Sequence, residues 1–233
     1  GGPIRNDNRI GSVTQFNSLR FTDTTGFLDW SRSGNRWLNS YYSNNHSLDS
    51  IIEVKDLIRR SRRGIIVTGN LRNIGRDGQG TDSLSSLIAQ FAQMIGFPII
   101  AGVQSGALRK EKPVIPYAEH LMKNPNIAKG MQPDLIIQLG TPLISTEISG
   151  IIKSNPAARH VLVQEFYPYE RADPDHTVTH RISSNIGNFL KGLMSDIESN
   201  ENSESCSELA PLVFLGEDLR KLMPTIISRT ASS

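Results

Sequence analysis

The sequence predicts an α/β fold: a doubly wound, mainly parallel sheet of five or six strands with helices on both faces. Short runs of β-branched and other apolar residues, as in GIIVTG over 64–69 and PDLIIQLG over 133–140, end on glycine and are typical of strands buried on both faces. These runs alternate with segments of roughly 10–15 residues whose apolar positions recur at helical spacing. Strands and helices that alternate in this way build a parallel sheet covered on both sides.

Five strands are expected from their apolar runs. They cover residues 64–69, 97–102, 133–140, 161–165 and 179–182. Pro98 interrupts the second run, and proline has no backbone N–H to donate to a strand ladder.

Helices are expected between these strands. The first starts near Leu48 and ends in the basic run of residues 59–63, where cations favour the negative end of the helix dipole. The second begins at a cap supplied by Thr81 or Asp82. Further helices are expected over 116–123, around 148–152 and over 186–194.

Composition divides the chain into three parts. Residues 1–47 are rich in Asn, Ser, Thr, Gly and Arg, with scattered aromatic residues, and are expected to form an extended connector or arm. Residues 48–195 form the α/β domain. Residues 196–233 start with a stretch, 196–208, that has five acids and no base, which predicts an acidic linker, followed by a C-terminal tail with a short helix over 217–223.

Charge and composition exclude several classes of protein. The 25 Lys and Arg against 23 Asp and Glu leave a net charge of +2, which argues against an obligate nucleic-acid-binding protein. No apolar run approaches the roughly 20 residues needed to span a bilayer. Cys206 is the only cysteine, so an intrachain disulfide and a Cys-based zinc site are excluded. The first residues, GGPIRN, contain no Met and no targeting signal and are interpreted as an internal cut in a longer chain.

Two turns after predicted strands are candidate ligand sites, because ligands of open α/β sheets bind beyond the carboxyl ends of the strands. The turn 69–83 contains GQGTDS over 78–83, a near match to G-x-G-x-x-G, but a surface loop is the favoured interpretation because Gly78 lies far from the strand. The turn 140–147, GTPLISTE, resembles the nucleotide-facing turn of sirtuin-like and thiamine-diphosphate enzyme domains. A helix start capped by Ser145 or Thr146 explains it equally well.

His176 and His180 are spaced as metal ligands on one helix face would be. Pro174 precedes them and a β-branched run joins them, so a turn in which Asp173 bonds its own backbone is favoured over a metal site. Likewise, the basic run 59–63 is interpreted as a charged helix end rather than a phosphate site. The sequence shows no complete catalytic constellation.

Three segments together resemble a known family. PDLIIQLG over 133–140, the run 161–166 and DPDHTVTHRISSNI over 173–186 are similar to the central domain of 2-succinyl-5-enolpyruvyl-6-hydroxy-3-cyclohexene-1-carboxylate synthases of the MenD type, and most like the PHYLLO form of plants and algae. The resemblance implies a Rossmann-like central domain between a pyrimidine-binding and a diphosphate-binding domain. Those two domains would hold thiamine diphosphate and Mg²⁺, outside this chain. The whole enzyme would decarboxylate 2-oxoglutarate and add the resulting carbanion equivalent to isochorismate.

The resemblance also suggests which residues face substrate. Many family members carry a Lys-Arg pair in the turn after the 133–140 strand, suited to substrate carboxylates; here Thr146 and Glu147 occupy those places, and Glu147 would repel a carboxylate. Ser145, Thr146, Glu147 and Arg171 are the substrate-facing candidates, and Lys153 or Arg171 could have taken over the role of the pair. No residue of this chain is predicted to be catalytic or to bind the cofactor or a metal.

The leading prediction is therefore a mainly structural central domain that is inactive when isolated, belongs to a homo-oligomeric enzyme, and, by likeness to the PHYLLO form, is located in the plastid. One alternative is a free-standing nucleotide-binding domain for FAD, ADP or NAD. A second alternative is a non-enzymatic interaction module that uses the aromatic residues of 1–45. Titration with nucleotides, and deletion of that arm, would separate the three hypotheses.

Overall fold

The structure is a computed structural model that describes residues 32, 39–42, 48–71, 81–165, 173, 175–199 and 207–231. The chain divides into two compact units, residues 1–37 and 38–233. All strands of the sheet belong to the second unit. Residues 78–80 of the glycine-rich motif lie outside the described residues, as do Arg171 and Cys206.

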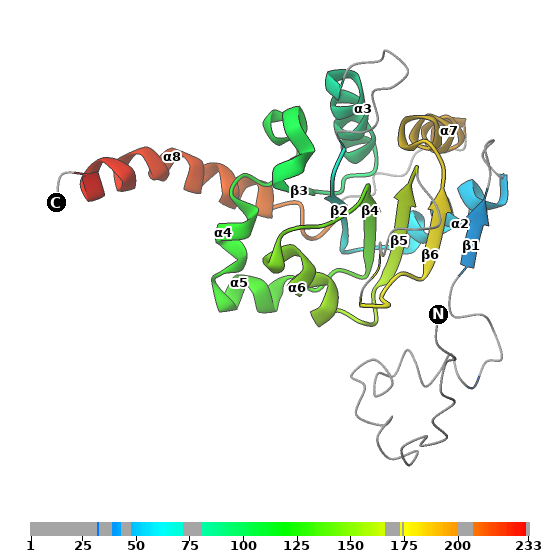
Figure 1. The fold of residues 1–233 in the computed structure, drawn as a ribbon, viewed down its shortest axis with the longest axis horizontal. Coiled ribbons are helices and arrows are strands. Elements are labelled where there is room, and N and C mark those ends of the chain that lie inside the picture. The colour runs from blue at the N-terminus through cyan, green and yellow to red at the C-terminus, as the bar shows by residue number, and fades with distance from the viewer. Residues whose placement is uncertain are drawn as a thin grey trace, which may run out of the picture. The chain divides into compact units, whose positions relative to one another are not determined.

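The second unit is built on one six-stranded, all-parallel sheet with the strand order β1-β6-β5-β4-β2-β3 (Figure 1). Its strands are β1 (Asn39–Tyr42), β2 (Gly64–Thr68), β3 (Ile99–Ala101), β4 (Leu135–Leu139), β5 (Arg159–Gln164) and β6 (His180–Ser183). The five strands expected from the apolar runs are all present. The predicted class, a doubly wound parallel α/β sheet, is confirmed.

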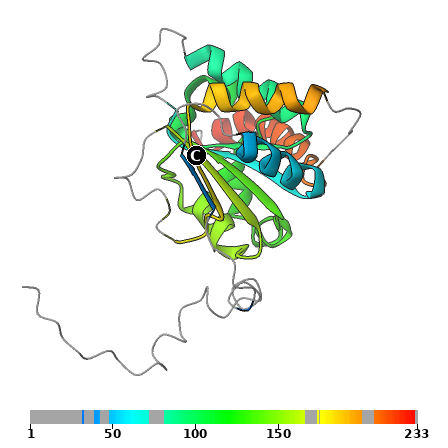
Figure 2. The ribbon, with the colours of Figure 1, turned by 90° about the vertical axis from the view of Figure 1, so that its right-hand side faces the viewer.

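Helices cover both faces of the sheet (Figures 1 and 2). One face carries α2 (Leu48–Arg60), α3 (Thr81–Met94) and α7 (Ile186–Ser199). The other carries α4 (Ala118–Met122), α5 (Pro125–Gly130), α6 (Thr146–Ser154) and the first turns of α8 (Leu212–Ala231). A 3-10 helix, η3 (Val103–Lys110), follows β3. None of the helices in the described ranges is long and apolar enough to cross a membrane.

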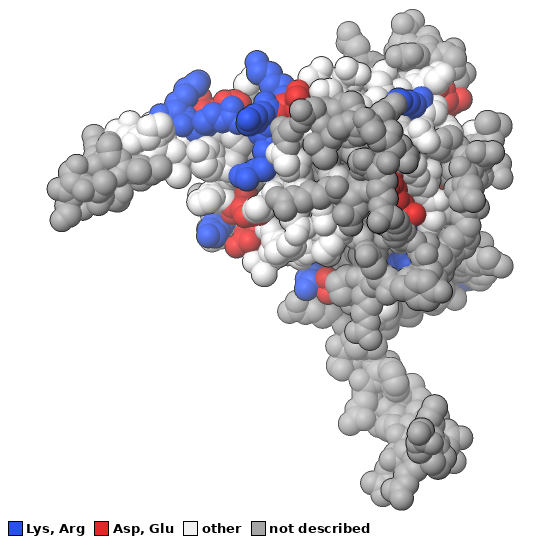
Figure 3. All heavy atoms as spheres, turned by 45° about the horizontal axis from the view of Figure 1, so that its top comes forward, with Lys and Arg blue, Asp and Glu red and all other residues white. Residues whose placement is uncertain are grey.

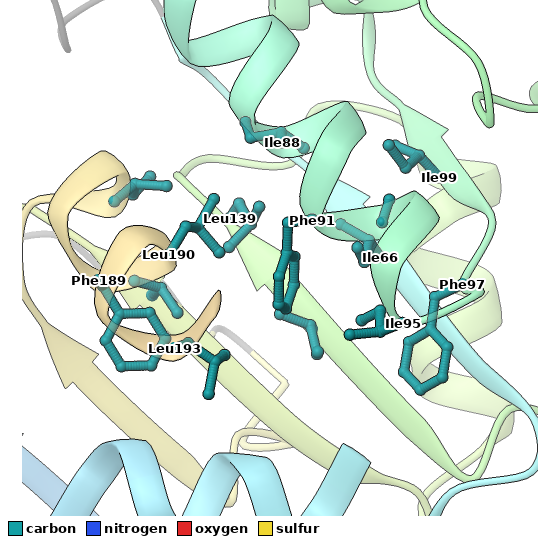
Figure 4. Packing of buried hydrophobic residues seen from close by; sticks show 14 of the residues in the cluster. Ile66, Ile88, Phe91, Ile95, Phe97, Ile99, Leu139, Phe189, Leu190 and Leu193 are labelled. Carbon is teal, nitrogen blue, oxygen red and sulfur yellow. The ribbon is translucent and has the colours of Figure 1, made fainter. Parts of the chain in front are cut away.

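Alternating strand residues feed two separate apolar layers, because successive side chains of a strand point to opposite faces. Ile66 packs in the layer under α3 and α7, where Phe91 and Phe189 are almost completely buried (Figure 4). Its neighbours Ile65 and Val67 belong to the layer under α4 and α6. Each fully buried large apolar side chain contributes about 1.5–3 kcal/mol to folding.

Two elements differ from the sequence prediction. The strand β1 lies inside the range 1–47, which was expected to be an extended connector, and pairs in parallel with β6 along its whole length. Its sequence, NSYY, has no apolar run that would reveal an edge strand. The expected tail with a short helix is instead the 20-residue α8, which contains Pro224. Leu209, just before α8, is buried in the second apolar layer, so this end of the chain is part of the folded unit.

Hydrogen bonds of the Arg63 and Asp134 side chains stabilise the amino-terminal edge of the sheet. The Arg63 guanidinium donates to the backbone oxygens of Gln132 (2.8 Å) and Gly130 (2.7 Å) and forms an ion pair with Glu208. The Asp134 carboxylate accepts the backbone N–H groups of residues 62 and 63. Arg63, in the connection between α2 and β2, therefore has a structural role. The last turn of α2 carries Arg59 and Arg60, in agreement with the interpretation of the basic run as a charged helix end.

Candidate functional site

The carboxyl edge of the sheet contains a topological switch point between β2 and β4. From β2 the chain crosses through α3 to β3, whereas from β4 it crosses through α6 on the opposite face to β5. The turns that follow β2 and β4 therefore lead away to opposite faces of the sheet. In open α/β sheets this is the place where ligands bind.

At this switch point the backbone segments that follow β2 and β4 pack directly against each other. Gly69 donates its N–H to the Leu139 oxygen at 2.9 Å, and a Cβ on Gly69 would lie 2.7 Å from the Gly140 oxygen. Gly140 itself has φ +76°, and a Cβ there would lie 2.6 Å from the Asn70 oxygen. Only glycine fits these two positions, because they hold neighbouring chain segments in direct contact.

A hydroxyl pair adds a side-chain contact at the same edge. The Oγ of Ser105, on η3, lies 2.5 Å from Oγ1 of Thr68, and both residues are buried. This bond ties η3 to the end of β2. Gly69 and Gly140 thus serve strand-to-strand packing at this edge, whereas Gly78 and Gly80 of the glycine-rich motif lie outside the described residues.

Above this floor lies a pocket of about 130 Å³, the carboxyl-edge pocket, lined by the residues that follow β2, β3 and β4. Its polar side chains include Gln104, Glu119 and Ser145, and its apolar side chains include Val103 and Ile144. Val103 is 64% exposed and Ile144 is 65% exposed. Pockets that bind cofactors and other drug-sized ligands have volumes of roughly 300–1,000 Å³, so this one is too small to enclose a nucleotide.

The N-terminus of α6, beside this pocket, is occupied by its own side chains. Ser145 is the N-cap and accepts the backbone N–H of Ile148 at 3.3 Å, which confirms the interpretation of the turn as a capped helix start. The hydroxyls of Ser145 and Thr146 both donate to Glu147 Oε2, at 3.2 and 2.9 Å. Bonding to its own backbone N–H, followed by the Thr146 hydroxyl, lowers the pKa of Glu147. An anionic ligand would meet this carboxylate at the helix end that otherwise favours anions.

Three of the four residues predicted to face substrate lie together here. Ser145, Thr146 and Glu147 form the first turn of α6, while the fourth, Arg171, lies outside the described residues. The alternative cation, Lys153, is in the last turn of α6 and forms an ion pair with Asp175 at 3.1 Å. It lies two helical turns away from the pocket and supplies no positive charge there.

The two histidines that could have been metal ligands are held apart by the local structure. His176 has φ +54° in a turn in which Asp173 accepts the backbone N–H groups of Thr177 (2.9 Å) and Val178 (3.0 Å). The predicted Asp173 turn is confirmed. His180 is in β6, and its Nε2 lies 3.0 Å from Glu53 Oε1. In the described part of the chain, no group of three His, Cys, Asp or Glu side chains could hold a metal ion.

Among the residues that the structure describes, His160 is one whose pKa burial shifts strongly. It is 3% exposed, and its two ring nitrogens lie 3.0 Å from Thr177 Oγ1 and from Gln138 Oε1. Burial lowers the pKa of His160 to about 4, so the ring is neutral at physiological pH. Burial also lowers the pKa of His180, although Glu53 acts to raise it. Both rings have partners within the fold, as expected of structural histidines.

No motif in the sequence marks Gln104 or Glu119 as a site residue. They come from η3 and α4, which the crossover from β3 to β4 brings beside the turn before α6. Only the strand order shows that they share a pocket with Ser145.

Charged residues are mixed on the surface that Figure 3 shows. The described part of α8 carries basic and acidic side chains side by side (Figure 3). Two of the contacts are ion pairs within α8, Arg220 with Glu217 and Lys221 with Asp218, each at 3.2 Å. This part of the surface therefore does not carry a single sign of charge.

The fold and its carboxyl edge define a doubly wound α/β domain whose switch point is closed by backbone and a helix cap. Comparison with known families identifies it further: the chain belongs to the family of middle domains of thiamine pyrophosphate enzymes, whose model matches residues 25–212.

Curated relatives agree with this family. The chain is 28% identical over 153 residues to a 2-succinyl-5-enolpyruvyl-6-hydroxy-3-cyclohexene-1-carboxylate synthase of Chlorobaculum tepidum. The matched region is 64% of this chain and 24% of that protein. It is 26% identical over 160 residues to the chloroplastic protein PHYLLO of Arabidopsis thaliana, covering 64% of this chain and 9% of that protein. The chain thus spans less than a quarter of the length of either relative.

Solved structures with a similar arrangement include a thiamine diphosphate-dependent 4-hydroxybenzoylformate decarboxylase of Rhodococcus jostii. It is 12% identical, with a TM-score of 0.40, over 70% of this chain and 30% of that one. A benzoylformate decarboxylase from Polynucleobacter necessarius is 18% identical, with a TM-score of 0.37, over 72% of this chain and 30% of that one.

Proposed function

We propose that this chain is the mainly structural middle domain of a thiamine diphosphate-dependent synthase that decarboxylates 2-oxoglutarate and adds the product carbanion to isochorismate. Membership of the middle-domain family and the names of its curated relatives support this proposal. Phylloquinone or menaquinone synthesis is the corresponding pathway. In the same proposal the parent enzyme is a homo-oligomer located in the plastid, by likeness to the chloroplastic protein PHYLLO.

One observation carries the structural role: the ligand position of the fold is filled by the chain itself. Gly69 and Gly140 bring backbone segments into contact at the switch point, and Glu147 occupies the N-terminus of α6. Both substrates named above are carboxylates. Glu147 repels them, so the domain does not provide their anchoring charge at this edge.

In this proposal thiamine diphosphate and Mg²⁺ are held outside this chain. Among the described side chains no group of three or more His, Cys, Asp or Glu residues could hold a metal ion, which supports that assignment. At positions 76–78 the sequence reads Arg-Asp-Gly instead of the Gly-Asp-Gly expected of a diphosphate-binding domain. In the proposal the two neighbouring domains therefore hold the cofactor, which supplies the carbanion chemistry, while this domain fixes their spacing.

The alternative function, nucleotide binding by this domain alone, is supported less well. The pocket at the switch point measures about 130 Å³, and the charged side chain that lines it, Glu119, has the same sign as a phosphate.

Titration calorimetry tests the proposal against this alternative. The chain is titrated with thiamine diphosphate plus Mg²⁺ and, in separate runs, with FAD, ADP and NAD. We expect no binding of any of them with a Kd below about 1 mM. Micromolar binding of a nucleotide would support the alternative, and micromolar binding of thiamine diphosphate would contradict the assignment of the cofactor to other domains.

A further inference from the structure

The residues just before α8 are hydrogen-bonded to the body of the domain. Ser207 is 2% exposed, and its Oγ donates to the backbone oxygen of Gly64, the first residue of β2, at 2.8 Å. Its backbone N–H donates to the Gly96 oxygen at 3.0 Å. The backbone N–H of Glu208 donates at 2.8 Å to an oxygen in the connection between α2 and β2. We call residues 207–209 the strap, because main-chain and side-chain bonds both hold this segment to the sheet.

A second set of contacts holds the first half of α8 itself. Leu209, at the end of the strap, is 4% exposed and packs in the apolar layer under α4 and α6, and Leu212 and Leu219 pack against the same layer. Gly216 is buried so closely on the turn before α4 that a Cβ there would lie 2.6 Å from the Pro116 oxygen. Positions 212, 216 and 219 share one face of the helix because they are spaced i, i+4 and i+7. The domain therefore holds α8 over two turns, about 10 Å of its length.

We propose that α8 is a rigid arm and that the strap and the Gly216 contact together fix its direction relative to the sheet. Figure 1 shows α8 running outward from the sheet. Close-packed contacts do not deform continuously, so a helix held at separate points along its length does not rotate freely about one of them. Pro224 has no N–H to donate within the helix, which limits the rigid part to residues 212–223.

The contrasting arrangement is a hinged helix that rotates about the segment before it. The strap is the segment that would have to hinge, and the N–H groups of Ser207 and Glu208 are both bonded to the domain. Ser207 Oγ also accepts the backbone N–H of Leu209 at 3.2 Å, which fixes the turn that leads into α8. These bonds favour a fixed arm over a hinge.

The arm is not explained by family membership, because the match to the middle-domain family ends at residue 212, where α8 begins. Its role rests on the proposed function: in the parent enzyme the arm would set the angle at which a neighbouring domain lies relative to the sheet. The rigidity of the arm does not depend on that role and is measured on the chain itself.

The test is a set of residual dipolar couplings of backbone N–H groups, measured on the weakly aligned 15N-labelled chain. We expect the couplings of residues 212–223 to fit one alignment tensor together with those of β2, β4 and β5. Order parameters from 15N relaxation should be about 0.85 for α8, the value of rigid backbone. A separate and smaller tensor for α8 in the parent chain would overturn the inference.

Variants show whether these contacts fix the arm. Gly216→Ala forces α8 away from Pro116, so the couplings of α8 should no longer fit the tensor of the sheet, and its order parameters should fall below about 0.6. Gly150→Ala, inside α6, is the matched control: nothing lies within 4 Å of the new Cβ, and the couplings of α8 should not change. Ser207→Ala removes the bond to β2 and provides a second test if Gly216→Ala fails to fold.

Couplings of α8 that still fit the tensor of the sheet in every strap and Gly216 variant that folds would also overturn the inference. None of these measurements involves a cofactor or a substrate. A failure here is therefore distinct from a failure of the proposed function.

Discussion

Substitution of Gly69 by alanine tests whether the glycines of the carboxyl edge hold the fold together or serve a ligand. The new Cβ would lie 2.7 Å from the Gly140 oxygen and 2.8 Å from the Pro142 oxygen, and both atoms are backbone. Backbone in the middle of the sheet edge moves only with its strand, so we expect an overpacking cost of about 1–3 kcal/mol. Gly140→Ala adds the cost of its positive φ, about 1–2 kcal/mol, to a similar clash and should destabilise the chain more.

Urea unfolding followed by far-UV circular dichroism measures these differences. Two other glycines provide controls. Gly106 has φ +59° with nothing within 4 Å of an added Cβ, so its alanine variant shows the backbone cost alone, about 1–3 kcal/mol. Gly150, inside α6, also has free space, and Gly150→Ala should stabilise the chain by about 0.5–1 kcal/mol. A Gly69→Ala variant as stable as the parent chain would refute the packing role and favour a ligand role.

Three further predictions concern the core and the polar contacts. Burial lowers the pKa of His160 to about 4 from 6.5, so the unfolded chain binds a proton more readily than the folded chain does. The free energy of unfolding should therefore be highest above pH 6.5 and fall by up to about 3 kcal/mol on acidification to pH 4. Urea unfolding of His160→Gln across this range should show a weaker pH dependence than that of the parent chain. Arg63→Ala should lower the free energy of unfolding by about 0.5–1.5 kcal/mol, because the exposed residues Gly130 and Gln132 lose a donor that water can replace. Arg63→Lys should not restore the lost stability, and a full rescue by lysine would contradict the role of the guanidinium. Phe91→Ala, at 0% exposure, should cost about 3–5 kcal/mol, and a loss below about 1 kcal/mol in urea unfolding would contradict the packing in Figure 4.

The strands and helices of the core were predictable because burial imposes a pattern on the sequence. GIIVT and LIIQL are buried at every position, and a strand covered on both faces must consist of such residues. β1 was missed for the opposite reason, since the sequence NSYY contains no run of aliphatic residues that would reveal a strand. α8 was predicted too short because Gly216 and Pro224, which interrupt helical patterns, bracket the expected segment.

The candidate site was predictable only where it depends on local structure. The Ser145 cap and the Asp173 turn involve residues a few positions apart, and local chemistry specifies both. The carboxyl-edge pocket joins Gln104 and Glu119 to Ser145, and this juxtaposition depends on the strand order. No local pattern in the sequence encodes that order.

The most direct test of the central claim is a turnover assay with 2-oxoglutarate, isochorismate, thiamine diphosphate and Mg²⁺. One sample is the chain alone, and the other is a chimera in which it replaces the matching segment of the Chlorobaculum tepidum synthase, 24% of that enzyme's length. We expect product from the chimera and none from the chain alone. Product formed by the isolated chain would contradict it.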